Sequence, residues 1–115
     1  MSVSFEEIGQ VLVTCKVKNF VSEGAVVKIA ENGTVALCAA GEDFCGVVVS
    51  MTEDNYAAVQ LKGFVRVACS DSTVGVGWVK VIANGFGGVK AAGSSTQGRE
   101  LLVMSRDDEN LVVCL

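Results

Sequence analysis

Three neighbouring acids, Asp107, Asp108 and Glu109, have the types and spacing of a possible metal site or acid–base pair. Carboxylates that hydrolyse a substrate face each other across a cleft of about 5 to 10 Å. These acids instead stand between two apolar runs, as the polar turn of a hairpin would. We therefore expect exposed acids, with Asn110 in a left-handed conformation, and almost no cost from replacing Asp107 or Asp108.

The cysteines give no clearer sign of chemistry. They form no CxxC pair and the chain has no histidine, so neither a zinc site nor a Cys-His or Ser-His-Asp arrangement is indicated. Glu6 and Glu7 near the N-terminus do not fit a secretory signal, so we expect reduced, buried thiols in a protein made in the cytoplasm. The five cysteines are Cys15, Cys38, Cys45, Cys69 and Cys114.

The glycine-rich stretch GFGGVK at 85–90 is the remaining candidate for a ligand site. It lacks the GxxxxGK[ST] pattern of a phosphate loop, and we expect no helix after it that could hold a phosphate. A hairpin tip with a packed Phe86 is the better interpretation. The sequence thus predicts no catalytic, cofactor-binding or metal-binding residues, and a protein that is not an enzyme.

Charge and hydropathy also limit the partners. The chain has 13 acids and 9 scattered bases, a net charge of −4, so no basic face is available for nucleic acid. Hydrophobic residues make up 50% of the sequence. Even so, no apolar run approaches the roughly 20 residues that a membrane-spanning helix needs.

The elements that must position any site are short strands. Apolar and polar residues alternate with period two in several valine-rich blocks, for example at 11–18 and 57–63. Asn32-Gly33 and Asn84-Gly85 permit the positive φ angles of two-residue hairpin turns. The pattern predicts an all-β fold, a small single-domain β-barrel or β-sandwich of short antiparallel strands.

Three segments stand out within this plan. Residues 1–9 precede the first clear alternation and are expected to form an N-terminal arm, with the β domain spanning 10–115. The Gly/Ser/Ala-rich segment 84–98 predicts an irregular loop. The runs 101–104 and 111–115 are expected to pair as the terminal hairpin, whose last strand closes the barrel.

Aromatic and apolar residues supply the candidate interface positions. Trp78 begins a predicted strand, where a place in the core is the simpler expectation and an interface anchor is the alternative. Phe5 lies in the arm, where an apolar side chain needs a partner to cover it. The candidate capsid or oligomer interface comprises Val3, Phe5, Ile8, Trp78 and Phe86.

The order of the segments carries a resemblance. NGTVALCAAGEDFCGVV, VQLKGFVRV, VGWVKVIANGFGGVK and the closing hairpin, at 32–48, 59–67, 76–90 and 101–115, look like the small capsid decoration (head-stabilising) proteins of tailed bacteriophages and prophages. The resemblance spans nearly the whole chain. It implies a non-enzymatic protein on the capsid exterior, made in the host bacterial cytoplasm, that binds the major capsid protein and cements the shell, often as a homotrimer with an ordered N-terminal arm. The five cysteines are more than this role requires.

Other functions stay open at this point. A head-fibre base or a tail protein could use the same small β fold, and a free β-barrel could bind a ligand if its interior held a cavity.

Overall fold

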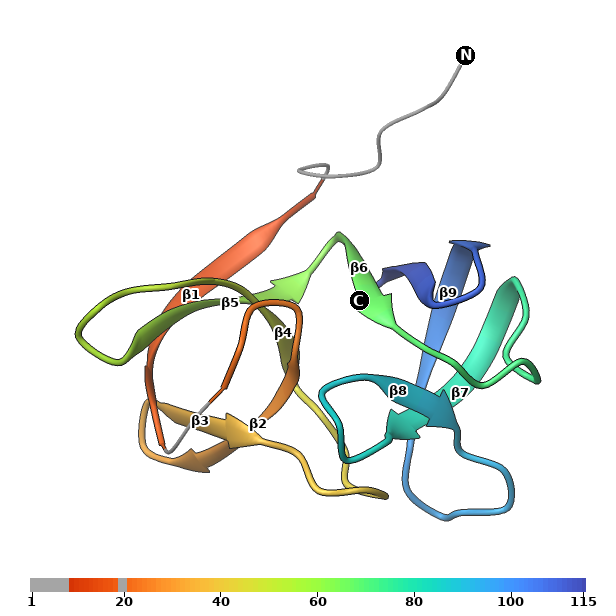
Figure 1. Cartoon of the computed structure of the whole chain (residues 1–115), viewed down its shortest axis with the longest axis horizontal. Coiled ribbons are helices and arrows are strands. Elements are labelled where there is room, and N and C mark those ends of the chain that lie inside the picture. Colours follow the sequence, from red (N-terminus) through yellow and green to blue (C-terminus); the bar gives the residue numbers. More distant parts are fainter. Residues whose placement is uncertain (1–8, 19–20) are drawn as a thin grey trace.

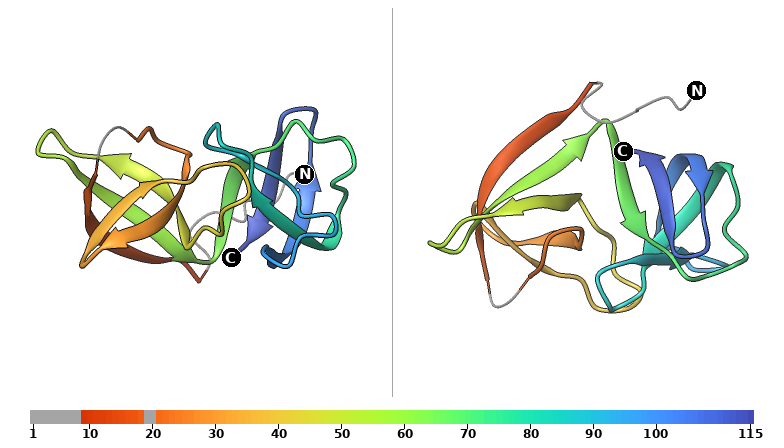
Figure 2. Two further views of the ribbon diagram at one scale, coloured as in Figure 1. Left: turned by 90° about the horizontal axis from the view of Figure 1, so that it is seen from below. Right: turned by 45° about the horizontal axis from the view of Figure 1, so that its top comes forward.

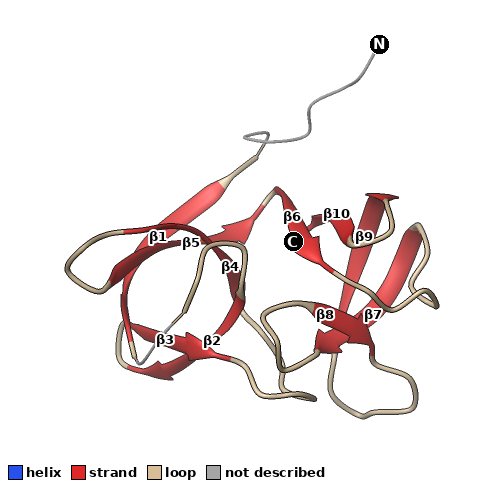
Figure 3. Ribbon diagram, viewed as in Figure 1, coloured by secondary structure: helices blue, strands red, loops and turns tan. Residues whose placement is uncertain are grey.

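The computed structural model of the chain describes residues 9–18 and 21–115, and its architecture is all-β, which confirms the predicted fold class (Figures 1 and 3). A closed five-stranded barrel lies beside a second, five-stranded sheet. The predicted arm, with Val3, Phe5 and Ile8, lies outside the described residues except for Gly9. Within the described ranges, no helix is long and apolar enough to cross a membrane. The strands are β1 Val11–Val17, β2 Val26–Glu31, β3 Thr34–Leu37, β4 Gly46–Met51, β5 Tyr56–Lys62, β6 Phe64–Ala68, β7 Gly77–Ala83, β8 Val89–Ala91, β9 Arg99–Arg106 and β10 Asn110–Cys114.

The barrel has the strand order β1-β3-β2-β4-β5 and closes through the antiparallel pair of β1 and β5. One of its pairs is parallel, β1 with β3, which sets Val17 beside Val35. This differs from the wholly antiparallel arrangement expected. The reason is geometric, because directions cannot alternate all the way around a ring with an odd number of strands.

Small side chains fill the barrel. Asn32-Gly33 forms the predicted turn between β2 and β3, with Gly33 at a φ of 64°. Alternate residues of the strands then point inward, which buries a core in which valine predominates, as a narrow barrel requires. The buried residues of this core are Cys15, Val17, Val21, Val27, Val35, Val48, Ala57 and Val59.

The second sheet has the order β6-β10-β9-β7-β8 and covers one side of the barrel (Figure 2). Its inner face packs Leu101, Leu111 and Val113 in one core cluster with Phe44 and Val47 from the barrel side. The chain passes from barrel to second sheet between β5 and β6, where Gly63 has a φ of 97°.

The terminal hairpin forms as predicted from β9 and β10, but its place in the fold was wrong. β10 lies between β6 and β9 in the second sheet and takes no part in closing the barrel. The chain leaves the barrel at Gly63, so β6 belongs to the second sheet, and β10 pairs with it in that sheet. Among the described residues other than glycine, only Asn55 has a positive φ, 61°, so the left-handed conformation expected at Asn110 is wrong.

The segment 84–98 also differs from its prediction as one irregular loop. Residues 84–88 form a five-residue connection after β7, longer than the two-residue turn expected at Asn84-Gly85. Val89–Ala91 then pairs with β7 as the short edge strand β8. The glycines mark the bends around this strand and do not prevent it.

Candidate functional site

Trp78 lies on the outer face of the second sheet, where 69% of its surface is exposed. Its expected place in the core is therefore wrong. Val81 faces the core from the same strand, and the period-two alternation sends Trp78 to the opposite face. The interface alternative for Trp78 remains open.

A row of apolar side chains crosses this face in cross-strand register. Trp78 on β7 is opposite Leu102 on β9, Leu102 is opposite Cys114 on β10, and Cys114 is opposite Phe64 on β6. Directly opposed residues of antiparallel strands project to the same side of a sheet. We call these four residues the apolar row. It presents Trp78 to solvent and keeps Leu102, Cys114 and Phe64 half-buried.

Charged residues border the apolar row. Lys80 is opposite Glu100 next to Trp78, and Arg66 lies two residues beyond Phe64 with its guanidinium 3.8 Å from the Asp107 carboxylate. An apolar centre within a polar rim is the usual anatomy of a protein–protein interface.

Phe86 stands at the tip of the loop between β7 and β8 and is 92% exposed. The expectation of a packed phenylalanine is wrong, because hydrogen bonds hold this loop and the Phe86 ring does not. The side-chain oxygen of Asn84 accepts hydrogen bonds from the amides of Phe86, at 2.7 Å, and Gly88, at 3.1 Å. The amide of Val26 donates to the carbonyl of Gly87 at 2.9 Å. Hydrogen bonds therefore fix the backbone at and after Phe86, while its aromatic ring is almost fully exposed to solvent.

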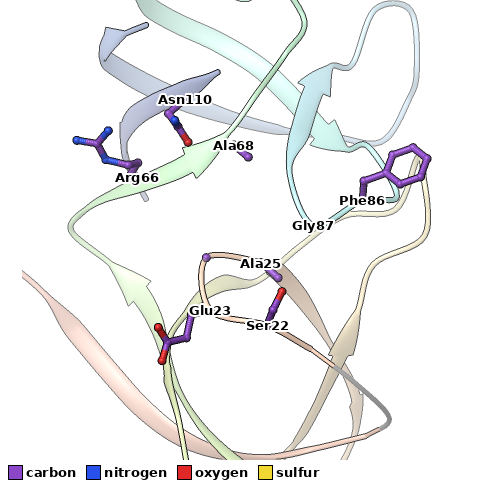
Figure 4. A pocket seen from close by; sticks show the side chains of 9 residues that line it. Ser22, Glu23, Ala25, Arg66, Ala68, Phe86, Gly87 and Asn110 are labelled. Atoms are coloured by element: carbon purple, nitrogen blue, oxygen red, sulfur yellow. The ribbon is translucent and has the colours of Figure 1, made fainter. Parts of the chain in front are cut away.

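A groove runs between the barrel and the second sheet (Figure 4). One part of it, about 280 Å³, lies between the Ser22–Ala25 segment and the strand residues Arg66 and Ala68, with Phe86 at its rim. An adjoining part of about 480 Å³ shares Glu23, Gly24 and Arg66 and reaches Gln60. Together these two parts form the groove.

Gln60 is the polar residue that sequence reasoning missed. It is 1% exposed, although the alternation along β5 groups it with the solvent-facing Lys62. Its Nε2 donates to the carbonyls of Lys62 and Phe64, both at 3.0 Å, and its Oε1 accepts from Gln10 Nε2 at 3.0 Å. Gln60 ties the end of β5 to the start of β6, a role that depends on where the two sheets meet.

The thiols do not show the features of activated nucleophiles. All five cysteines are free, three of them buried, while Cys45 and Cys114 are half-buried. Burial, reinforced by the nearby Glu42 carboxylate, raises the pKa of Cys38 to about 11. Burial likewise raises the pKa of Cys45. A catalytic cysteine needs the opposite shift.

The carboxylates with shifted pKa values serve as hydrogen-bond acceptors. The Lys28 ammonium lies 2.8 Å from Glu42 and, with the Ala39 amide, lowers the pKa of that carboxyl. Backbone amides of Glu109 and Asn110 lower the pKa of Asp107 in the same way. Over residues 9–18 and 21–115, no group of three or more Cys, Asp or Glu residues is gathered so that it could hold a metal ion.

No family model matches the chain, and no curated protein matches it either. The likeness to capsid decoration proteins stays an expectation from the sequence. The surfaces that could bind a partner are the apolar row, the Phe86 loop and the groove.

Proposed function

We propose that this protein is a non-enzymatic structural protein of a virion, which binds the outside of a phage capsid and stabilises the shell. Its partners in this role are the major capsid protein and further copies of itself, with a homotrimer as the expected assembly. It would be made in the cytoplasm of the host bacterium and act on the capsid exterior.

The observation that carries the proposal is the exposure of two aromatic side chains on well-ordered backbone at separate places. Trp78 is the second residue of β7, and Phe86 lies at the tip of a hydrogen-bonded loop. Tryptophan and other large anchors contribute most of the binding energy of protein interfaces. A protein that bridges neighbouring subunits needs anchors of this kind on more than one surface, and several weak contacts then gain by multivalency.

The packed interior of the barrel supports a structural role over ligand binding. Val27, Val35 and Val59 are completely buried there. A ligand-binding barrel of this size needs space in place of such side chains.

The arm belongs to this proposal as a prediction from the sequence alone. Val3 and Phe5 are two residues apart, so an extended arm would present both on one side. Such an arm could add a strand to the sheet edge of a capsid subunit.

The decisive experiment mixes the protein with expanded, undecorated capsids and counts the copies bound at saturation. We expect saturable binding that Phe86→Ser or Trp78→Ser weakens by at least about tenfold, the change expected on loss of a hot-spot side chain. Ile29→Ser, which removes an apolar residue exposed to 58% on the barrel, is the matched control and should bind as the unchanged protein does. Absence of saturable binding would rule the proposal out.

A further inference from the structure

Strand β1 extends beyond its neighbour β3 and leaves part of one side unpaired. β3 pairs with β1 only at Lys16 and Val17. The preceding residues of β1, Val11–Cys15, pair with β5 on one side and with no described strand on the other. In Figure 1 this half of β1 runs away from β3 along the rim of the barrel. We call the unpaired side of Val11–Cys15 the β1 edge.

Hydrogen bonds at the paired end of β1 fix which backbone groups face the β1 edge. The amide of Lys16 donates at 2.9 Å to Gly33 beside β3, whereas the amide of Val17 donates at 2.8 Å to the turn before β5. Backbone groups of successive strand residues point to opposite sides, and the register with β5 runs unbroken from Leu12 to Lys16. Leu12 and Thr14 therefore direct their N–H and C=O groups to the β1 edge. Among residues 9–18 and 21–115, none bonds these groups.

The side chains of this segment are exposed and uncharged. Val11, Leu12 and Val13 have 47%, 44% and 37% of their surfaces exposed, and no residue of Val11–Cys15 carries a charge. An exposed apolar strand with unpaired backbone groups is a template for another strand.

The two outer strands of the second sheet carry a protection that the β1 edge lacks. Arg66 is the central residue of β6, and Lys90 is the central residue of β8. If either strand paired with its own copy about its centre, like charges would be directly opposed, which is destabilising. Charged residues on outer strands prevent such pairing in natural proteins. Of these three edges, the β1 edge is the one that suits a second copy.

We infer that two copies of this chain pair antiparallel along their β1 edges, about a two-fold axis at Val13. Leu12 of each copy then lies opposite Thr14 of the other, so that their N–H and C=O groups bond one another. Val11 lies opposite Cys15, so the unpaired segment of one copy matches the same segment of the other. The pairing uses none of the residues of the apolar row, and it does not depend on the proposed function.

The structure limits this contact at both ends. β1 begins at Val11, after a turn of the chain at Gly9, which has a φ of 65°. At the other end Lys16 is already bonded to Gly33. The pairing therefore stops at Val11 and Cys15 of each copy, and so short an interface is expected to be weak.

Sedimentation velocity of the full-length protein from about 10 μM to about 1 mM tests the pairing, with amide hydrogen exchange measured in the same samples. We expect a monomer–dimer equilibrium with a dissociation constant of about 0.1 to 1 mM, in the range of weak interfaces. The amides of Leu12 and Thr14 should gain protection as the concentration rises. The amide of Val13, which faces β5, should be protected at every concentration and serves as the internal control.

Two double variants of the same exposed residues test the register. Leu12→Lys/Thr14→Lys sets like charges opposite each other and should abolish the dimer. Leu12→Glu/Thr14→Lys sets opposite charges together and should bind at least about tenfold more tightly than the first variant. Ile29→Lys changes another exposed apolar residue of the barrel and should leave the association unchanged. Protection of the Val13 amide shows in each variant that β1 still pairs with β5.

Three outcomes would overturn the inference. The first is a protein that stays monomeric at the highest concentration. The second is equal protection of the Leu12 and Thr14 amides at all concentrations, because the β1 edge would then be covered within one molecule. The third is association that persists in Leu12→Lys/Thr14→Lys, which would place the contact on another surface, and its loss in Trp78→Ser would identify that surface as the apolar row. No capsid is needed for these measurements, so their failure is distinct from failure of the proposed function.

Discussion

Asp71 Oδ2 accepts a hydrogen bond of 3.0 Å from the Ala91 amide, which joins the loop after β6 to the edge strand β8. The other oxygen of this carboxylate accepts from the Thr73 hydroxyl at 2.6 Å and from the Thr73 amide at 3.0 Å. These donors, the hydroxyl first, lower the pKa of Asp71 from 3.8 to about 2. The ionised carboxylate thus covers the free edge of β8 and orders the loop.

Asp71→Asn should destabilise the protein in a pH-dependent way. The folded-state pKa is depressed, so the contribution of the carboxylate is present above its ordinary pKa of 3.8 and is lost as the pH falls through about 2. The urea midpoint of Asp71→Asn should therefore lie below that of the unchanged protein at pH 7. The difference should shrink between pH 4 and pH 2. A constant difference across that range would mean that the charge is not involved.

The strands and their short turns could be predicted from the sequence because they depend on neighbouring residues. Asn32-Gly33 and the terminal hairpin are both local, and both formed where predicted. The partner of β10 could not be predicted in this way, since it depends on the exit of β6 from the barrel at Gly63. The parallel pair of β1 and β3 likewise follows from closure of a five-stranded ring and from no local signal.

The candidate site was predictable in its residue types but not in its exposure. Trp78 and Phe86 were both named as candidate interface residues, yet a place in the core was the simpler expectation for Trp78 and a packed ring at a hairpin tip was expected for Phe86. The period-two alternation along a strand predicts which residues share a face of the sheet. Which face is exposed depends on how the second sheet packs on the barrel. The burial of Gln60 could not be predicted for the same reason, because it arises where the barrel meets the second sheet.

Gln60→Ala should cost about 2 to 4 kcal/mol in the free energy of unfolding, because it removes the buried amide that donates to the carbonyls of Lys62 and Phe64. Urea denaturation measures this. Gln10→Ala is the control, since it removes only the bond to Gln60 Oε1 and should cost about 1 kcal/mol. Equal losses for the two variants would contradict the role given to the Gln60 amide group.

Trp78→Ser should change the free energy of unfolding by less than about 0.5 kcal/mol, as substitutions at exposed positions usually do. By contrast Leu101→Ala, which truncates a side chain 1% exposed on the neighbouring strand, should cost about 2 to 5 kcal/mol.

Because Trp78 is the single tryptophan, its fluorescence reports this site alone. Acrylamide should quench it readily in the free protein and less when a partner covers the apolar row. Weak quenching in the free protein would show that the row is already covered.

The terminal hairpin gives the last prediction. Deleting residues 111–115 should abolish folding, because it removes the strand between β6 and β9 together with the fully buried Leu111 and Val113.

Asp107→Ala should lower stability measurably, contrary to the expectation from sequence, since Asp107 Oδ1 accepts from the amides of Glu109 and Asn110 at 2.9 and 2.8 Å. The lowered pKa of Asp107 means that this loss should diminish in acid, as the carboxylate is protonated below its ordinary pKa of 3.8. Asp108→Ala is the matched control and should leave the thermal midpoint unchanged. If Asp107→Ala and Asp108→Ala have the same thermal midpoint at every pH, the turn is held by its backbone alone and the Asp107 carboxylate contributes nothing to its stability.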